Sequence, residues 1–255
     1  MTVDDPVARL RAAGCVLAEE EARLIADAAG DDAGVHESLL RRRLAGEPLE
    51  VVLGWAQFAG LRIPAAAGVF VPRRRTELVA RLAAALSPPG GTVVDLCSGT
   101  GAIAAAVAHA RPDLEVTAAE IDPAAVALAS RTLAPFGASC MVSDMDGALG
   151  HLAGRVDAVT ACPPYVPTAQ IPLMPREARD HEPRLALDGG PDGTALQREV
   201  LAASSRLLRA GGVVILETSE ALAPLTLAAA AHAGFAAGIE RDEDLGAVVV
   251  VARRA

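Results

Sequence analysis

The sequence predicts an α/β fold, in which a doubly wound, Rossmann-like sheet follows a small N-terminal helical domain and a linking β-hairpin. From residue 92 onward, short apolar segments alternate with helical segments, which is typical of a parallel sheet with helices on both faces. The first part of the chain instead carries apolar side chains at helical spacing. Hydrophobic residues make up 52% of the 255 residues, so the chain can bury a large core.

The N-terminal region predicts helices. Val7, Leu10 and Leu17 recur at about helical spacing, and the pattern continues through Ile25. It is interrupted at residues 30–32 and then resumes, before ending at a glycine and a proline. These features predict a helical domain over residues 1–48, which is too short to be well stabilised alone.

Residues 49–75 have a different character. Short apolar runs at residues 51–53, 57–58 and 69–71 are separated by glycine and proline residues. Runs of this kind are typical of short strands joined by turns. We therefore predict a β-hairpin or an irregular strand pair that links the helical domain to the rest of the chain.

Residues 76–255 predict the sheet domain. Strands are expected at residues 92–96, 115–119, 139–142, 156–161, 213–217, 236–241 and 247–252. Helices are expected at residues 76–86, 102–110, 123–133, 194–208 and 221–233. A short turn joins the last two strands, so these two must run antiparallel.

Composition and charge argue against several classes of protein. The chain carries 32 acidic and 23 basic residues, for a net charge of -9, whereas nucleic-acid binding depends largely on basic contacts to phosphate. Cys15, Cys97, Cys140 and Cys162 are widely spaced, so we expect neither a disulfide framework nor a metal site. No signal peptide and no apolar stretch of about 18 residues is visible, so we expect a cytoplasmic protein without a membrane segment.

A loop of small residues follows the first strand of the expected sheet. The strand ends at Asp95-Leu96, and Cys97-Ser98-Gly99-Thr100-Gly101 follow. Small residues let the backbone turn tightly and approach a ligand, which in such sheets binds at the carboxyl ends of the strands. Glu120 ends the second strand, where a carboxylate can accept hydrogen bonds from both hydroxyls of a ribose.

This loop leaves two cofactors open. Gly99, Gly101 and Ala104 also satisfy the loose dinucleotide fingerprint, but Asp95 would repel a pyrophosphate. Asp95 suits the ammonium group of S-adenosylmethionine, and Asp144 after the third strand can accept from an adenine amino group. The sequence therefore favours S-adenosylmethionine. The residues predicted to bind it are Asp95, Cys97, Ser98, Gly99, Thr100, Gly101, Glu120, Ile121, Asp144, Met145 and Cys162.

The fourth strand ends in a turn with two prolines, Cys162-Pro163-Pro164-Tyr165. Two prolines cannot continue a central strand, because each lacks the N–H that the strand ladder needs. They impose a rigid turn at the edge where ligands bind and place Tyr165 beside that edge. We take these four residues as the candidate catalytic turn.

From about residue 42 to its end, the chain resembles the HemK/PrmC family of protein-glutamine N5-methyltransferases. The resemblance lies in residues 43–49, 71–73, 76–77 and 95–103, in the Pro-Pro-Tyr turn, and most specifically in the run Arg179–Gly193, RDHEPRLALDGGPDG. It implies a seven-stranded class I methyltransferase domain that uses S-adenosylmethionine. It also implies that the N-terminal helical domain meets a protein substrate presenting a glutamine loop.

The family's usual turn, Asn-Pro-Pro-Tyr, fits the chemistry of a glutamine amide. That nitrogen is a poor nucleophile, so it must be held in line with the methyl group while both amide protons are accepted. In the family, the Asn side-chain oxygen and a proline carbonyl accept them, and the tyrosine packs on the amide. By resemblance, Pro163 offers its carbonyl and Tyr165 its ring.

Three positions depart from the family pattern. Cys162 stands where the family has Asn, and the chain contains no Asn at all. Cys97 replaces the first glycine of the cofactor loop, and Arg74-Arg75 replace a Pro-acid pair. Because sulfur is a weak acceptor, three outcomes stay open: the backbone carbonyls suffice, the acceptor is a different nitrogen, or activity is reduced or lost.

The sequence is therefore compatible with more than one function. The main hypothesis is methylation of a protein glutamine, on a release factor, a ribosomal protein or another substrate. The first alternative is methylation of a small-molecule or amino-acid nitrogen, with nucleic-acid bases as a weaker variant because of the acidic charge. Another is a protein that binds S-adenosylmethionine without catalysis. An NAD-linked oxidoreductase lacks an evident acid or base on the substrate side.

Overall fold

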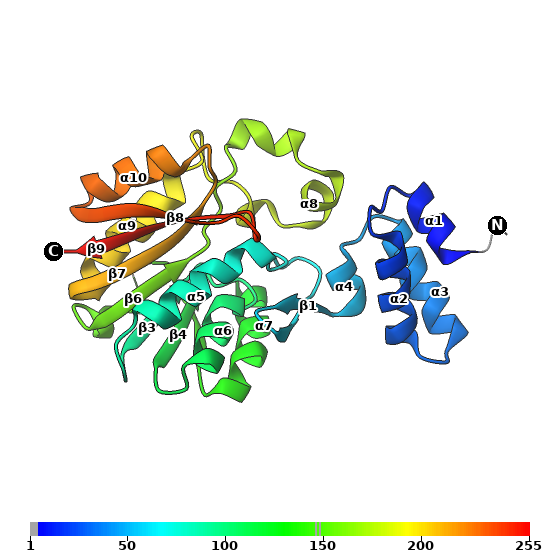
Figure 1. Cartoon of the computed structure of the whole chain (residues 1–255), viewed down its shortest axis with the longest axis horizontal. Helices are drawn as coiled ribbons and strands as arrows, with labels where there is room; N and C mark the ends of the chain where they lie inside the picture. Colours follow the sequence, from blue (N-terminus) through cyan, green and yellow to red (C-terminus); the bar gives the residue numbers. More distant parts are fainter. Residues whose placement is uncertain (1–4, 146, 148) are drawn as a thin grey trace.

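The computed structural model describes residues 5–145, 147 and 149–255, so the first four residues of the predicted helical domain lie outside it. Three helices form the N-terminal bundle: α1 (Pro6–Ala12), α2 (Ala18–Ala29) and α3 (Ala33–Leu44). They pack around Leu10, Ala18, Ile25 and Leu40, which are fully buried. Figure 1 shows this bundle beside the larger sheet domain, with the linker between them.

Short polar residues define where these helices begin. The Asp5 carboxylate accepts a hydrogen bond from the backbone N–H of Val7 at the start of α1, at 3.1 Å. Asp32 accepts from Gly34 and Val35 at the start of α3. Each cap satisfies N–H groups that have no partner inside the helix.

The linker differs from its prediction at two places. Residues 51–53 belong to a short helix, α4 (Leu49–Leu53), so the strand predicted there is wrong. Pro48 precedes the first helical residue and Gly54, at φ 82°, ends the helix, which is the usual placement of these two residues. The hairpin itself consists of β1 (Trp55–Phe58) and β2 (Leu61–Pro64), and residues 69–71 form no strand.

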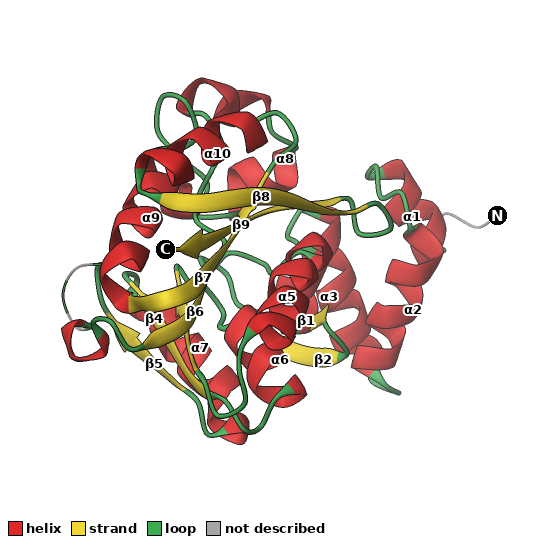
Figure 2. Cartoon of the chain, turned by 60° about the vertical axis from the view of Figure 1, so that its left-hand side comes forward, coloured by secondary structure: helices red, strands yellow, loops and turns green. Residues whose placement is uncertain are grey.

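Among the residues that the structure describes, the sheet domain contains seven strands, as expected. These are β3 (Thr92–Leu96), β4 (Glu115–Glu120), β5 (Ser139–Val142), β6 (Val156–Ala161), β7 (Leu208–Thr218), β8 (Phe235–Asp242) and β9 (Ala247–Arg254). Their order is β5-β4-β3-β6-β7-β9-β8, and β9 is antiparallel to both of its neighbours. Figure 2 shows β5 and β8 at opposite edges. The fold is therefore the doubly wound class that the sequence predicts.

Helices cover both faces of this sheet. The longer ones are α5 (Glu77–Leu86), α6 (Ala102–Ala110), α7 (Pro123–Leu133), α9 (Ala195–Leu207) and α10 (Ala223–His232). Short segments complete the domain: η1 (Arg74–Thr76), η2 (Ala134–Phe136), η3 (Gly150–Leu152), η4 (Thr168–Leu173), α8 (Arg176–His181) and η5 (Arg184–Ala186). In the part of the chain that the structure describes, none of the helices is long and apolar enough to cross a membrane.

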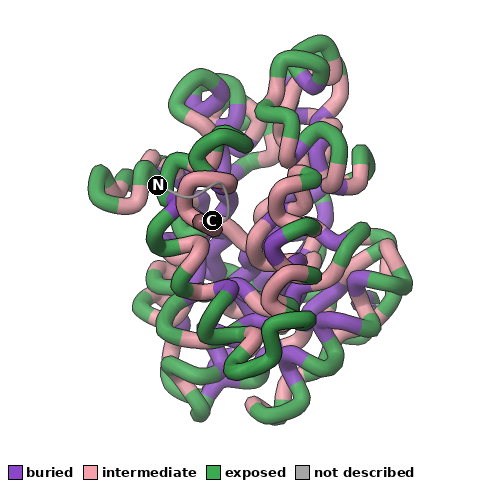
Figure 3. Tube along the Cα trace, turned by 90° about the vertical axis from the view of Figure 1, so that its right-hand side faces the viewer, coloured by how far each residue is buried: buried purple, intermediate pink, exposed green. Residues whose placement is uncertain are grey.

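The core consists of two apolar layers, one on each face of the sheet. Val93 packs with α5 and α6, whereas its neighbour Val94 packs with α9. Val213 and Val214 divide in the same way, because successive side chains of a strand point to opposite faces. Figure 3 shows the buried segments running through the interior of the molecule. Burial on both faces explains why these strands are mostly apolar.

Candidate active site

Strand register places the predicted site residues at one edge of the sheet. Leu96 at the end of β3 pairs with Ala119 of β4 and with Ala161 of β6. Ala161 also pairs with Leu216 of β7. The residues that follow these positions therefore emerge side by side, and they include Cys97, Glu120, Cys162 and Glu217.

The loop between β3 and α6 needs its glycines for two reasons. Gly99 and Gly101 have φ angles of 53° and 76°, a left-handed region that suits glycine. A Cβ on Gly101 would also lie 3.2 Å from the Cβ of Ala129 on α7. Cys97 adopts a φ of 54° as well, where a side chain is strained.

Glu120 ties this loop to the next one. One carboxylate oxygen accepts from the backbone N–H of Gly99 at 2.9 Å. The other accepts from Ile121 at 2.7 Å and from Asp122 at 3.1 Å. The carboxylate is thus fixed at the mouth of the loop, where two adjacent hydroxyls of a ribose can reach it.

A cleft runs along this edge of the sheet. Most of the predicted cofactor residues line it: Cys97, Ser98, Gly99, Thr100, Glu120, Ile121, Asp144, Met145 and Cys162. The sequence analysis missed other lining residues, among them Phe70, Leu185, Leu196 and Glu199. These come from the linker, the run after β6 and α9, and only tertiary structure brings them to the cleft. The mixture of apolar walls and a fixed carboxylate fits an adenosine group.

Asp95 and Gly101 lie outside the lining of this cleft. Asp95 is fully buried near the end of β3, where one carboxylate oxygen accepts from the Thr160 hydroxyl of β6 at 2.7 Å. The other oxygen has no hydrogen-bond partner among the described residues. Burial raises the pKa of Asp95 to about 7. Asp95 therefore lies in the interior between β3 and β6, and not in the lining of the cleft, where the sequence predicts it.

The catalytic turn stands between the cleft and a second cavity. Cys162 and Pro164 line both spaces, as do Phe70 and Ala186. Pro163 and Tyr165 line only the second cavity, whose volume is about 490 Å³. The catalytic turn therefore forms a wall that the cleft and the second cavity share.

Tyr165 is held by two charged side chains. Its hydroxyl donates to Glu217 at 3.0 Å and accepts from Nε of Arg75 at 3.2 Å. Nε of Arg75 also donates to Glu217 at 3.1 Å. Burial, together with the charge of Glu217, raises the pKa of Tyr165, so the hydroxyl stays protonated. Glu217 was missed by the sequence analysis, although an acid at the end of a buried strand is a usable signal.

The Cys162 thiol stays neutral. Burial raises its pKa well above the usual value, and the nearby charge of Glu217 adds to the effect. A thiolate is the nucleophilic form of cysteine, so this environment does not favour covalent catalysis. The side chain instead contributes an apolar, weakly accepting surface to the walls of the cleft and the second cavity.

The run Arg179–Gly193 packs against the catalytic turn and lines part of both cavities. A Cβ on Gly189 would lie 2.7 Å from the Cα of Tyr165, and one on Gly193 would lie 2.6 Å from its carbonyl oxygen. Only glycine permits this approach, which explains the two glycines in the motif. The run thereby fixes the backbone of the catalytic turn.

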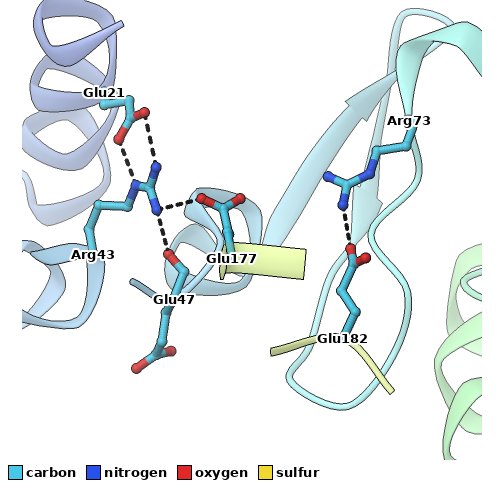
Figure 4. A network of polar contacts seen from close by, with 6 residues as sticks. All are labelled: Glu21, Arg43, Glu47, Arg73, Glu177 and Glu182. Carbon is cyan, nitrogen blue, oxygen red and sulfur yellow. Dashed lines mark hydrogen bonds and ion pairs between the residues drawn. The ribbon is translucent and has the colours of Figure 1, made fainter. Parts of the chain in front are cut away.

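Ion pairs connect the segment between β6 and α9 to the linker and to the helical bundle (Figure 4). Arg43 on α3 binds Glu21 at 2.6 Å, the carbonyl oxygen of Glu47 at 2.9 Å and Glu177 on α8 at 2.8 Å. Arg73 in the linker binds Glu182 at 2.5 Å. Glu177, Glu182 and Arg73 also line the second cavity, so these pairs shape the walls of that cavity.

Known proteins share both the fold and a part of the sequence. A precorrin-6y C5,15-methyltransferase from Geobacter metallireducens aligns with a TM-score of 0.50 and 12% identity, over 75% of this chain and 92% of that one. A predicted O-methyltransferase from Agrobacterium tumefaciens aligns with a TM-score of 0.50 and 21% identity, over 69% and 80%. Residues 60–175 match the methyltransferase small domain. The protein is a class I methyltransferase that uses S-adenosylmethionine.

Closer relatives define the family. The chain is 39% identical over 200 residues to the release factor glutamine methyltransferase of Moorella thermoacetica, covering 77% of this chain and 70% of that protein. It is 34% identical over 271 residues to that of Bifidobacterium longum, covering 92% of both. The chain belongs to the release factor glutamine methyltransferase family. It is also 40% identical over 185 residues to 4-amino-L-phenylalanine/4-methylamino-L-phenylalanine methyltransferase of Streptomyces pristinaespiralis, covering 70% of this chain and 63% of that protein.

Proposed function

We propose that this protein methylates the side-chain amide nitrogen of a glutamine in a protein, and that a release factor is the substrate. The observation that carries the proposal is the position of the catalytic turn, whose Cys162 and Pro164 line both the cofactor cleft and the second cavity. Relatives named for this reaction cover most of the chain. S-adenosylmethionine supplies the methyl group from the cleft.

The residues around the turn have separate roles in binding the cofactor and in activating the amide. Glu120 and Asp144 hold the ribose and the adenine of the cofactor, with Ile121 and Met145 against the base. Asp95 joins the end of β3 to β6, through the hydroxyl of Thr160. The Pro163 carbonyl accepts a hydrogen bond from the amide N–H, so that electron density can shift to the nitrogen.

Tyr165 positions the flat amide group. Its hydroxyl is held on two sides by Glu217 and Arg75, so the ring has a fixed orientation before the substrate arrives. Pre-positioning of this kind lowers the barrier, because the reacting atoms need no further alignment. The helical domain, residues 1–48, would contact the protein substrate, while residues 49–75 link it to the methyltransferase domain, residues 76–255.

Methylation of a purified bacterial release factor tests the proposal. The protein is incubated with isotopically labelled S-adenosylmethionine and the release factor, and the label is located by peptide mass spectrometry. We expect label on one glutamine, and none with a release factor in which that glutamine is replaced by asparagine. A Tyr165→Ala variant serves as the inactive enzyme. Absence of label on glutamine with the wild-type enzyme would refute the proposal.

A second candidate is methylation of the amino group of an aromatic amino acid. Two observations favour it: Cys162 in place of the family's Asn, and the similarity to the enzyme from Streptomyces pristinaespiralis. An aromatic amine keeps more electron density on its nitrogen than an amide does, so it needs fewer acceptors for its protons. Transfer of label to 4-amino-L-phenylalanine, in competition with the release factor, decides between the two substrates.

A further inference from the structure

Arg75 presents unused hydrogen-bond donors beside the catalytic turn. Its Nε binds Tyr165 and Glu217, and its side chain, 40% exposed, lines the second cavity. Neither of its two Nη atoms makes a hydrogen bond to a residue that the structure describes. The planar guanidinium therefore offers its outer edge to whatever occupies the cavity.

The orientation of this guanidinium is set in advance. Glu217 is only 1% exposed on its side chain, and it holds Nε at 3.1 Å, while Tyr165 holds the same atom from a second direction. Such anchoring reduces the rotational freedom that an arginine loses when it binds a ligand. Arg75 is thus prepared for binding before any ligand enters.

The other charged groups of the cavity wall are already paired. Glu182 binds Arg73, and Glu177 binds Arg43 of the helical bundle. The acidic residues of the wall therefore have arginine partners of their own, and none of them pairs with Arg75.

We propose that Arg75 binds a carboxylate of the methyl acceptor. A carboxylate matches the two Nη donors of an arginine and forms paired, charge-assisted hydrogen bonds with them. The cavity volume of about 490 Å³ lies in the usual range for a small-molecule site, roughly 300–1,000 Å³. The carboxylate belongs either to a free amino-acid acceptor or to an acidic residue next to the methylated glutamine. The proposal rests on the proposed function, because it takes this cavity as the acceptor site.

Calorimetric titration in the presence of S-adenosylhomocysteine tests the proposal without requiring methyl transfer. The first probe pair is 4-amino-L-phenylalanine and its carboxamide, which differ only in the carboxylate. The second pair consists of short peptides with a glutamine flanked by glutamate or by a second glutamine. We expect one pair to bind, with the carboxylate member at least about tenfold tighter, as charge-assisted hydrogen bonds give.

Two variants assign the preference to Arg75. In Arg75→Gln the carboxylate and neutral members should bind equally, whereas Arg75→Lys should restore part of the difference. Arg74→Gln is the matched control, since Arg74 is exposed and lies outside the lining of the second cavity. If Arg75→Gln weakens both members equally, Arg75 only positions Tyr165 and the proposal is wrong. It is also wrong if neither pair shows a preference or if neither binds to the wild type.

The outcome is separable from that of the methylation test. A carboxylate preference without methylation of the release factor would support the role of Arg75 and refute the protein-glutamine function. Methylation of the release factor without any carboxylate preference would support the protein-glutamine function and refute the role of Arg75. Circular dichroism of each variant verifies that it is folded.

Discussion

At the scale of single residues, Cys162 distinguishes this protein from the family pattern. Its thiol occupies the position of an amide oxygen that would accept a proton from the substrate. Burial keeps the thiol neutral by raising its pKa, so it can neither accept strongly nor act as a nucleophile. The acceptors left beside the nitrogen are backbone carbonyls, which every residue at this position would supply.

Replacing Cys162 by asparagine should therefore increase glutamine methylation. Because a well-placed polar group contributes roughly 2–4 kcal/mol to a transition state, we expect the rate constant of methyl transfer to rise at least about tenfold. The measurement is single-turnover methylation of the release factor at saturating cofactor. Cys15→Ser, in the helical bundle, is the control. An unchanged rate in Cys162→Asn, with normal cofactor binding, would mean that the site is not built for an amide.

Glu120 offers a second test at this scale. Removing its carboxylate in Glu120→Ala takes away the acceptor for the ribose and loosens two backbone turns that it now holds. We expect the dissociation constant for S-adenosylmethionine to rise about 10- to 100-fold, as for the loss of charged hydrogen bonds. Equilibrium dialysis gives the constant. Glu115→Ala, at the exposed start of the same strand, should leave it unchanged.

At the scale of elements, the segment between β6 and α9 depends on ion pairs with distant parts of the chain. Arg43 is the central residue, because it joins α2, α3 and α8 and its side chain is only 10% exposed. Glu21, its partner on α2, is 12% exposed. A carboxylate that is mostly buried needs its partner, since water cannot replace the lost contact.

Arg43→Ala should lower the free energy of unfolding by about 2–4 kcal/mol, somewhat less than the loss of a fully buried pair. Urea denaturation followed by circular dichroism measures the change. Arg41→Ala is the matched control on the same helix, because Arg41 is 69% exposed and its pair with Glu37 contributes little. Equal effects of the two substitutions would contradict the role given to Arg43.

Element boundaries show where sequence reasoning works and where it fails. The strands of the sheet were predictable, because apolar runs bounded by glycine and proline have few other interpretations. The helix at residues 51–53 was not predictable, because three apolar residues are too few to show a helical or a strand period. Its ends depend on Pro48 and Gly54. The short helices between β6 and α9 have no apolar period at all.

At the scale of the whole molecule, stability should depend on pH through Asp95 at the centre of the sheet. Its folded pKa of about 7 lies above the ordinary value of 3.8. The neutral carboxyl group therefore contributes stability that is complete below pH 3.8 and is lost as the pH rises to about 7. The size of this contribution is about 4 kcal/mol, from the difference between the two pKa values.

Asp95→Asn removes this titration while keeping an acceptor for the Thr160 hydroxyl. We expect the difference in unfolding free energy, wild type minus variant, to fall by about 4 kcal/mol between pH 4 and pH 7.5. Urea denaturation at a series of pH values measures it, and the subtraction removes the titration of other groups. Parallel curves for the two proteins would show that Asp95 titrates normally.

The sequence by itself determined the fold class, the cofactor loop, the acid at Glu120 and the turn ending in Tyr165. These features are local, because each depends on residues that are close together in the chain and at the end of a recognisable strand. The burial of Asp95 and the contacts of Arg75 were decided only by the tertiary structure. Arg75 and Glu217 are separated by 142 residues, and the order of strands and helices in space brings them together. A contact between residues so far apart in the chain cannot be predicted from the pattern of any single segment.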